Sequence, residues 1–103
     1  MLLTTTPSVE GRKITKYCGV VTGEGIVGAT VFKELFDGLR GLAGGLTAAY
    51  QKHFQGAREI AMKELEERAR HFAADAVVGI DLGYEVLGSM LMVSAVGTAV
   101  VIE

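Results

Sequence analysis

An amphipathic segment at residues 47–72 constrains the fold more than any other feature of this sequence. Apolar residues recur along it at steps of three and four, the spacing that lines one face of an α-helix. On the opposite side, acidic residues precede basic ones by four positions, which is typical of a solvated helix face. The segment therefore predicts one long helix with a single buried stripe. The stripe comprises Leu46, Tyr50, His53, Phe54, Ala57, Ile60, Ala61, Leu65, Ala69 and Phe72, and the charged pairs are Glu59–Lys63, Glu64–Arg68 and Glu66–Arg70.

The predicted helix is long for the chain that contains it. About 26 residues make a helix of roughly 39 Å, whereas a compact domain of about 100 residues has a radius of gyration of only about 13 Å. The chain has 103 residues and is expected to form one domain, residues 1–103. We therefore expect other copies of the chain to cover part of the helix.

Two strands are expected near the start of the chain. Residues 2–5 favour a short strand that ends before Pro7. Residues 14–21 favour a second strand, in which Cys18 and Val20 share one face and Val21 lies on the other.

The end of the chain predicts a hairpin of two long strands, residues 76–86 and 90–102, joined by a tight turn at residues 87–89. A hairpin with one solvated face alternates apolar and polar residues. The last strand is apolar at both alternating sets of positions instead. We therefore expect both of its faces to be covered.

A short helix is expected between the second strand and the long helix. Thr30 can cap this helix, which would run through Val31, Phe32, Leu35 and Phe36. Glycines then interrupt the helical pattern and predict a bend. The predicted fold class is α+β: a β-β-α-α-β-β subunit with an antiparallel sheet and one long helix. The glycines are Gly38, Gly41, Gly44 and Gly45.

Composition points to self-association and excludes several partners. Half of the residues are hydrophobic and the mean hydropathy is +0.36, more than so small a domain can bury alone. A closed homo-oligomer would cover the excess. The net charge of −2, without a basic cluster, predicts neither nucleic acid nor membrane as a partner. Residues 1–7 do not have the pattern of a signal peptide, and a lone cysteine suits a reducing compartment, so a cytoplasmic protein is expected.

The segment Gly23–Gly28 matches the G-x-G-x-x-G spacing of dinucleotide-binding loops. In such loops the amides at a helix N-terminus hold a pyrophosphate. No second βαβ unit and no acidic residue about 20 positions on accompany the match. With fourteen glycines in the chain, a chance match is the favoured interpretation.

Cys18 is the candidate metal ligand, because a thiolate binds soft divalent or monovalent ions such as zinc and copper. It has no C-x-x-C partner and no neighbouring histidine, so a small buried apolar residue is the alternative interpretation. A symmetric assembly could gather several copies of this thiol around an axis.

Other potential ligands are too scattered to form a site. His53 and His71 would share a helix face but lie roughly 27 Å apart. Glu67 and His71, with Asp75 nearby, favour a surface salt bridge over a metal site. No Ser-His-acid or Cys-His arrangement is recognisable, so no catalytic residue is assigned. Met90 and Met92 would lie on one strand face, where core filling is the ordinary explanation.

Four segments in order, Tyr17–Glu24, Ala57–Ala61, Ala74–Asp81 and Met90–Ala95, resemble the YbjQ-like family of small bacterial proteins. The resemblance covers nearly the whole chain. It implies a subunit related in shape to dodecin subunits that assembles into a ring, typically a homopentamer. It implies no established activity, since heavy-metal binding is a label of the family rather than a demonstrated function.

Three functional hypotheses follow. The preferred one is a homo-oligomeric binding or scaffold protein that holds a soft metal ion or small ligand at subunit interfaces. The first alternative is an enzyme with an inter-subunit active site near Cys18 and the Gly23–Gly28 loop. The second is a purely structural oligomer that docks another protein.

Overall fold

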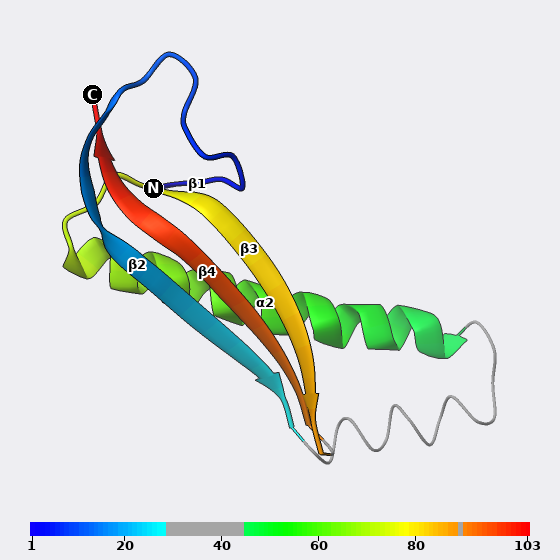
Figure 1. The fold of residues 1–103 in the computed structure, drawn as a ribbon. Helices are drawn as coiled ribbons and strands as arrows, with labels where there is room; N and C mark the ends of the chain where they lie inside the picture. The colour runs from blue at the N-terminus through cyan, green and yellow to red at the C-terminus, as the bar shows by residue number, and fades with distance from the viewer. Residues whose placement is uncertain (29–44, 89) are drawn as a thin grey trace.

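The computed structural model describes residues 1–28, 45–88 and 90–103 as four strands and one helix (Figure 1). The strands form one sheet in the order β1-β3-β4-β2, and helix α2 packs along one face of it. The described region is therefore a small α+β domain, as predicted. The elements are β1 Leu2–Leu3, β2 Ile14–Val27, α2 Gly45–His71, β3 Ala76–Leu87 and β4 Met90–Ile102.

Part of the expected connection cannot be compared with the structure. The short helix predicted after Thr30 and the glycines at positions 38, 41 and 44 lie outside the described residues, as does Ser89. The tight turn of the hairpin is confirmed at its base, where Leu87 pairs directly with Met90.

The long helix is confirmed, although it begins two residues earlier and ends one residue earlier than predicted. Its end has a left-handed cap: Ala73 has a φ of 55°, and the amide of Ala74 donates to the carbonyl of Ala69 at 3.3 Å. Glycine is the usual residue in this conformation, because it has no side chain to clash. The cap turns the chain directly into β3.

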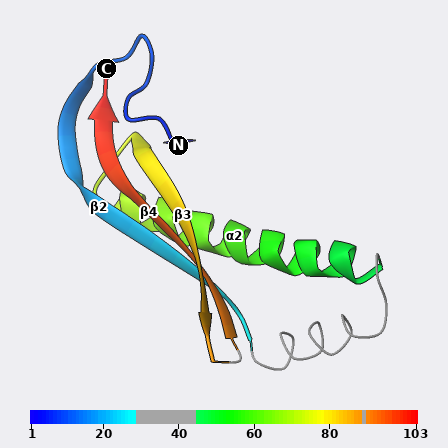
Figure 2. The same cartoon turned by 45° about the vertical axis from the view of Figure 1, so that its right-hand side comes forward.

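The sheet is mixed rather than antiparallel as predicted. The long strands β2, β4 and β3 pair antiparallel, but β1 pairs parallel with β3 through Leu2 and Leu3. The residues after β1 continue alongside β3, because the amide of Ile80 in β3 donates a hydrogen bond to the carbonyl oxygen of Thr4. A strand of two residues carries too little pattern for the sequence to indicate which strand it joins. The N-terminal segment then leads around the end of the sheet to β2, near the C-terminus (Figure 2).

Strand β2 departs from its predicted face assignment. The register of β2 against β4 shifts between Tyr17 and Gly19, where Gly19 has a φ of 150°. A bulge of this kind inserts one residue and resets the alternation of side chains. Cys18 consequently packs with the helix-side core, as does Val21, while Val20 is 70% exposed. The strand also continues to Val27, six residues past its predicted end.

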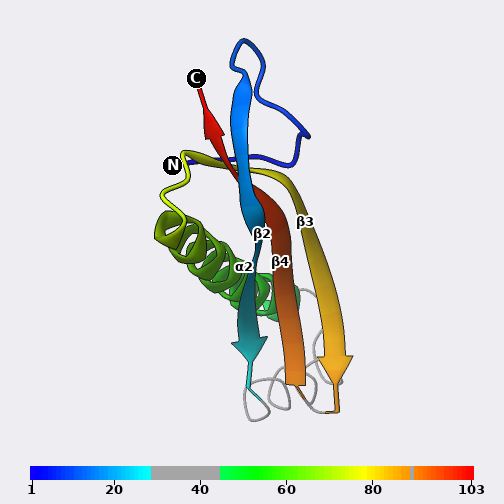
Figure 3. The same cartoon turned by 60° about the vertical axis from the view of Figure 1, so that its left-hand side comes forward.

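Two apolar clusters lie on opposite faces of the sheet. The larger cluster joins α2 to β2 and β4 and contains fully buried Ala61, Leu65 and Val93. Figure 3 shows α2 behind β2 and β4, with β3 on the side of the sheet away from β2. The smaller cluster consists of Ala76, Val78, Val100 and Ile102, against which Val9 and Ile14 pack.

The prediction that both faces of the last strand are covered therefore holds for only one end of it within the subunit. Val100 and Ile102 are buried by the N-terminal residues of the same chain. Toward the hairpin turn, Val96 and Met90 on β4 remain exposed.

Candidate functional site

Cys18 lies on β2 and is half-buried against the helix-side core. Within residues 1–28, 45–88 and 90–103, no group of three or more histidine, cysteine, aspartate or glutamate side chains could hold a metal ion. A protein zinc site takes three or four such ligands. The described residues of the chain thus do not form a three-ligand metal site around this thiol.

Most of the Gly23–Gly28 segment belongs to a strand, whereas the sequence motif indicated a loop. Residues 23–27 belong to β2, and Gly23 and Gly25 face the backbone of α2. A Cβ atom at Gly23 would overlap the carbonyl oxygen of Ala61, and one at Gly25 would overlap that of Ala57. The glycine spacing therefore allows a strand and a helix to pack at backbone contact.

The fold separates the other potential ligands, as their spacing in the sequence indicated. His53 lines a hollow with Ile26 near the C-terminal end of β2, and His71 lines a separate hollow with Val20 near the middle of that strand. The carboxylate of Asp75 accepts a hydrogen bond from the amide of Ile102 at 3.1 Å, so it closes the end of the sheet. Among the described residues, these side chains form no common site.

The two methionines of β4 are not core residues, contrary to the ordinary explanation given above. Met90 is exposed and Met92 is half-buried. Met92 pairs with Ile26 and Glu85 across the sheet, on the face away from α2. The thioethers therefore lie near the hairpin end of an open sheet face, away from Cys18 on the helix side.

Two hollows lie between α2 and the outer edge of β2, and we call them together the β2 groove. Residues from β2 and α2 line both hollows, together with Gly28 in one and Phe72 in the other, and no residue of β4 lines either. The groove is therefore open along the free side of the sheet. Its residues are Ile26, Val27, Gly28, Lys52, His53, Gly56, Ala57 and Ile60 at one end, and Val20, Val21, Thr22, Arg68, His71 and Phe72 at the other.

The β2 groove is basic. Lys52, His53, Arg68 and His71 line it, and its described lining contains no acidic side chain. Arg68 lines one of the two hollows and donates to the carbonyl and hydroxyl oxygens of Thr22, both at 2.8 Å. Its guanidinium also pairs with the carboxylate of Glu64 at 2.9 Å. A cation thus holds the helix to the outer edge of the strand.

The other long edge of the sheet carries an exposed apolar row, Leu82, Tyr84 and Val86 of β3, which we call the β3 strip. Its members are 37%, 48% and 63% exposed, because α2 lies mainly over β2 and β4. The ring of Tyr84 contacts that of Phe54 at a centroid distance of 6.1 Å. Its hydroxyl lies 3.5 Å from Nη1 of Arg58, which donates to it. The helix therefore holds the central residue of the strip in place.

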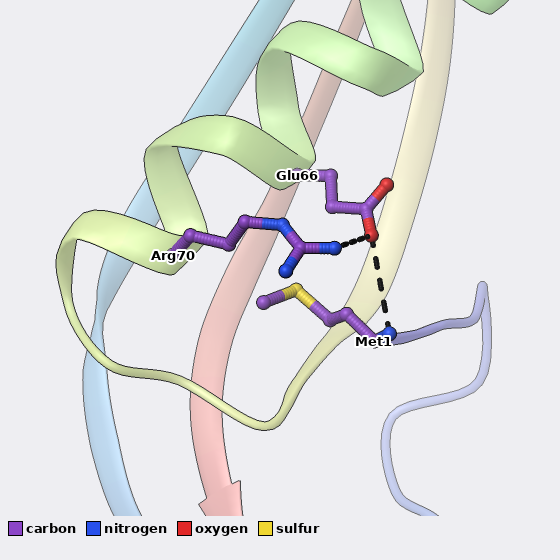
Figure 4. Close-up of polar contacts among 3 residues, drawn as sticks. All are labelled: Met1, Glu66 and Arg70. Atoms are coloured by element: carbon purple, nitrogen blue, oxygen red, sulfur yellow. Dashed lines mark hydrogen bonds and ion pairs between the residues drawn. The ribbon is translucent and has the colours of Figure 1, made fainter.

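The N-terminal segment covers only the first part of the β3 edge. The N-terminal ammonium lies 3.9 Å from the carboxylate of Glu66, which Arg70 also contacts at 2.8 Å (Figure 4). Backbone hydrogen bonds from this segment reach no farther along β3 than Ile80. In the part of the chain that the structure describes, the outer side of β3 from Asp81 onward has no strand partner.

Comparison with known proteins decides the family. The model of the YbjQ family described as "Putative heavy-metal-binding" matches residues 1–103, the whole chain. The chain belongs to this family. The YbjQ-like chain is also similar to a crystal structure of a protein of unknown function from Pediococcus pentosaceus ATCC 25745, which belongs to the DUF74 family. The TM-score is 0.67 at 18% identity, and the match covers 100% of this chain and 98% of that one. At this identity the likeness establishes the fold alone.

The described helix of this YbjQ-like chain is not a membrane span. No helix in the described part of the chain is both long and apolar enough to cross a bilayer.

Proposed function

We propose that this YbjQ-like chain works as one subunit of a homo-oligomeric ring, which binds a soft metal ion or a small ligand between subunits. The observation that carries the proposal is the shape of the single chain. Its radius of gyration is 16.6 Å and it measures 54 × 23 × 16 Å, whereas a compact domain of this length has a radius of gyration of about 13 Å. A chain this extended leaves apolar side chains exposed along both long edges of its sheet.

The small number of donor atoms that one chain brings together favours a binding site between subunits over a site within one subunit. The described residues of one chain contain no three-ligand group, and Cys18 supplies a single thiol. The family description nevertheless refers to heavy metals. A ring, as a homopentamer or a multiple of it, would bring one copy of this thiol from each subunit into a symmetric arrangement. We further propose a cytoplasmic location, where a reducing environment keeps such a thiol free.

Metal analysis of the protein purified without an affinity tag tests this proposal. We expect zinc or copper at a stoichiometric ratio to the ring, and we expect Cys18→Ser to lose it, because a hydroxyl is a poor ligand for soft ions. Met92→Leu is the matched control and should keep its metal, since it removes a sulfur on the opposite face of the sheet. Equal metal content in Cys18→Ser and the unchanged protein would remove Cys18 from the site.

The same measurement separates the alternatives. An oligomer that contains no metal and retains no small molecule supports a structural scaffold that docks another protein. The enzyme hypothesis placed an active site near a loop at Gly23–Gly28, but residues 23–27 belong to β2, and Gly23 and Gly25 face the backbone of α2. Native mass spectrometry measures the assembly independently, and a mass of 10.9 kDa at micromolar concentration would overturn the ring.

A further inference from the structure

We propose that the sheet face away from α2 binds a soft monovalent metal ion, such as copper(I) or silver(I), at its hairpin end. The donors of this thioether site are the sulfurs of Met90 and Met92 and the carboxylate of Glu85. The site lies within one chain, on the face of the sheet opposite Cys18. It therefore depends neither on the ring nor on the thiol proposed above, and it can be tested separately from both.

The register of the final hairpin brings the three side chains together. Met90 and Met92 are two positions apart on β4, so they share one face of the sheet and lie about 7 Å apart along the strand. Glu85 of β3 pairs directly with Met92. Directly opposed residues of an antiparallel pair have Cβ atoms about 5 Å apart, and diagonal neighbours lie about 7 to 8 Å apart. Because methionine is unbranched and flexible, both sulfurs and the carboxylate can reach a common ion.

The two methionines are accessible, although methionine usually fills a core. Met90 is 39% exposed and Met92 is half-buried, whereas Leu91 between them is buried in the helix-side cluster. The sheet face away from α2 is therefore open at this end of β4. An exposed thioether can donate a sulfur lone pair to an ion from solution, which a methionine enclosed in a core cannot do.

The surroundings of the two sulfurs are acidic. Asp81 and Glu85 of β3 and Glu24 of β2 pair with β4 positions on this same face. Strands β3 and β4 contain no basic residue, and the only one in β2, Lys16, lies near the opposite end of the sheet. None of the three carboxylates forms an ion pair with a described residue. Their charge attracts cations, while the thioethers favour soft ions over hard ones such as magnesium and calcium.

The donor set favours a monovalent ion over zinc. A zinc site takes three or four thiolate, imidazole or carboxylate ligands, and the described residues bring no three such groups together. Thioethers are instead ligands for copper(I). A neutral sulfur binds less tightly than a thiolate, so this site is expected to fill with added ion rather than to retain metal through purification. Met92→Leu therefore remains a control for metal retained at Cys18.

Titration of the Cys18→Ser protein with silver(I) tests the thioether site, because silver(I) is soft and monovalent, needs no reductant, and meets no thiol in this variant. Calorimetry in a nitrate buffer is expected to show saturation at a single ion per chain. Adding Met90→Leu and Met92→Leu should abolish this binding, since both sulfurs are lost while apolar side chains of similar size remain. Met62→Leu is the matched control, because this methionine packs against the helix-side core, and it should leave silver binding unchanged.

Two further measurements distinguish the thioether site from other ligands. Glu85→Gln should weaken silver binding, whereas Glu59→Gln, at an exposed position on α2, should not. Both residues are exposed, so neither change endangers the fold. Silver binding should also change little between about pH 7 and about pH 5.5, because a thioether has no proton to lose, whereas binding by imidazole falls over this range.

The outcomes separate this inference from the proposed function. Equal silver affinity in the double methionine variant and in the Cys18→Ser protein would overturn the thioether site, as would binding that falls with pH. Unchanged affinity in Glu85→Gln would overturn the arrangement of three donors. A wild-type mass of 10.9 kDa would overturn the ring and leave the thioether site intact. Silver binding by a protein that retains no metal on purification would overturn only the site between subunits.

Discussion

Gly23→Ala is expected to lower the free energy of unfolding by about 3 kcal/mol, the upper part of the range for overpacking a core. The added methyl group would overlap the carbonyl oxygen of Ala61 and lie 2.7 Å from the amide nitrogen of Leu65. Both atoms belong to the backbone of α2, which cannot rotate aside as a side chain can. The helix must therefore move away from β2, and the fully buried contacts of Leu65 weaken with it.

Gly56→Ala is the matched control for this prediction, because it adds the same methyl group to α2 at a position with open space around it. It should raise the free energy of unfolding by about 1 kcal/mol, since alanine favours a helix interior over glycine. Urea denaturation at one fixed protein concentration compares the variants, because the stability of an oligomer depends on concentration. Equal denaturation midpoints for Gly23→Ala and the unchanged protein would contradict the packing described for these glycines.

Leu65→Ala is expected to lower the free energy of unfolding by about 2 to 5 kcal/mol, through lost apolar burial and the cavity left behind. Leu65 is fully buried at the centre of the helix-side cluster, where α2 meets β2 and β4. Its neighbours belong to regular elements on both sides, so the site can collapse only in part. Chemical denaturation monitored by circular dichroism measures the change.

Leu2→Ala makes the same chemical change at a leucine that is 44% exposed on the two-residue strand β1. Its expected cost is within about 0.5 kcal/mol, as for most surface substitutions. A similar decrease in the free energy of unfolding for Leu2→Ala and Leu65→Ala would contradict a dominant contribution of the helix-side core to stability.

The long helix and the final hairpin could be predicted because each carries a strong periodic pattern over more than ten residues. Residues 47–72 place apolar side chains on one face, and the structure buries Ala57, Ala61, Leu65 and Ala69 from that stripe. The exposed Ile60 belongs to the same stripe but lies on the β2 flank of the helix. Periodicity indicates which face of a helix is apolar, and it does not show how much of that face a single sheet can cover.

The faces of β2 could not be predicted, because a bulge leaves no pattern of its own in a single sequence. Alternation placed Cys18 with Val20, whereas the register shift at Gly19 places it with the helix-side core. The candidate metal ligand was therefore identified by its chemistry, but its surroundings were assigned to the wrong face. The β2 groove was missed for a related reason. Its basic side chains come from positions 52, 53, 68 and 71, and only packing of the helix against an edge strand brings them to the same side of the sheet.

The amino-acid sequence by itself determined the α+β class, the family, the long helix and an excess of apolar surface, because these depend on composition and on patterns within continuous segments. Tertiary structure alone decided the role of Gly23 and Gly25, the parallel pairing of β1 and the two unlike edges of the sheet. Each of these depends on distances between segments far apart in the chain. The sequence alone does not distinguish a glycine that packs against a helix from a glycine in a phosphate-binding loop. The neighbouring backbone of α2 shows that Gly23 and Gly25 are of the first kind.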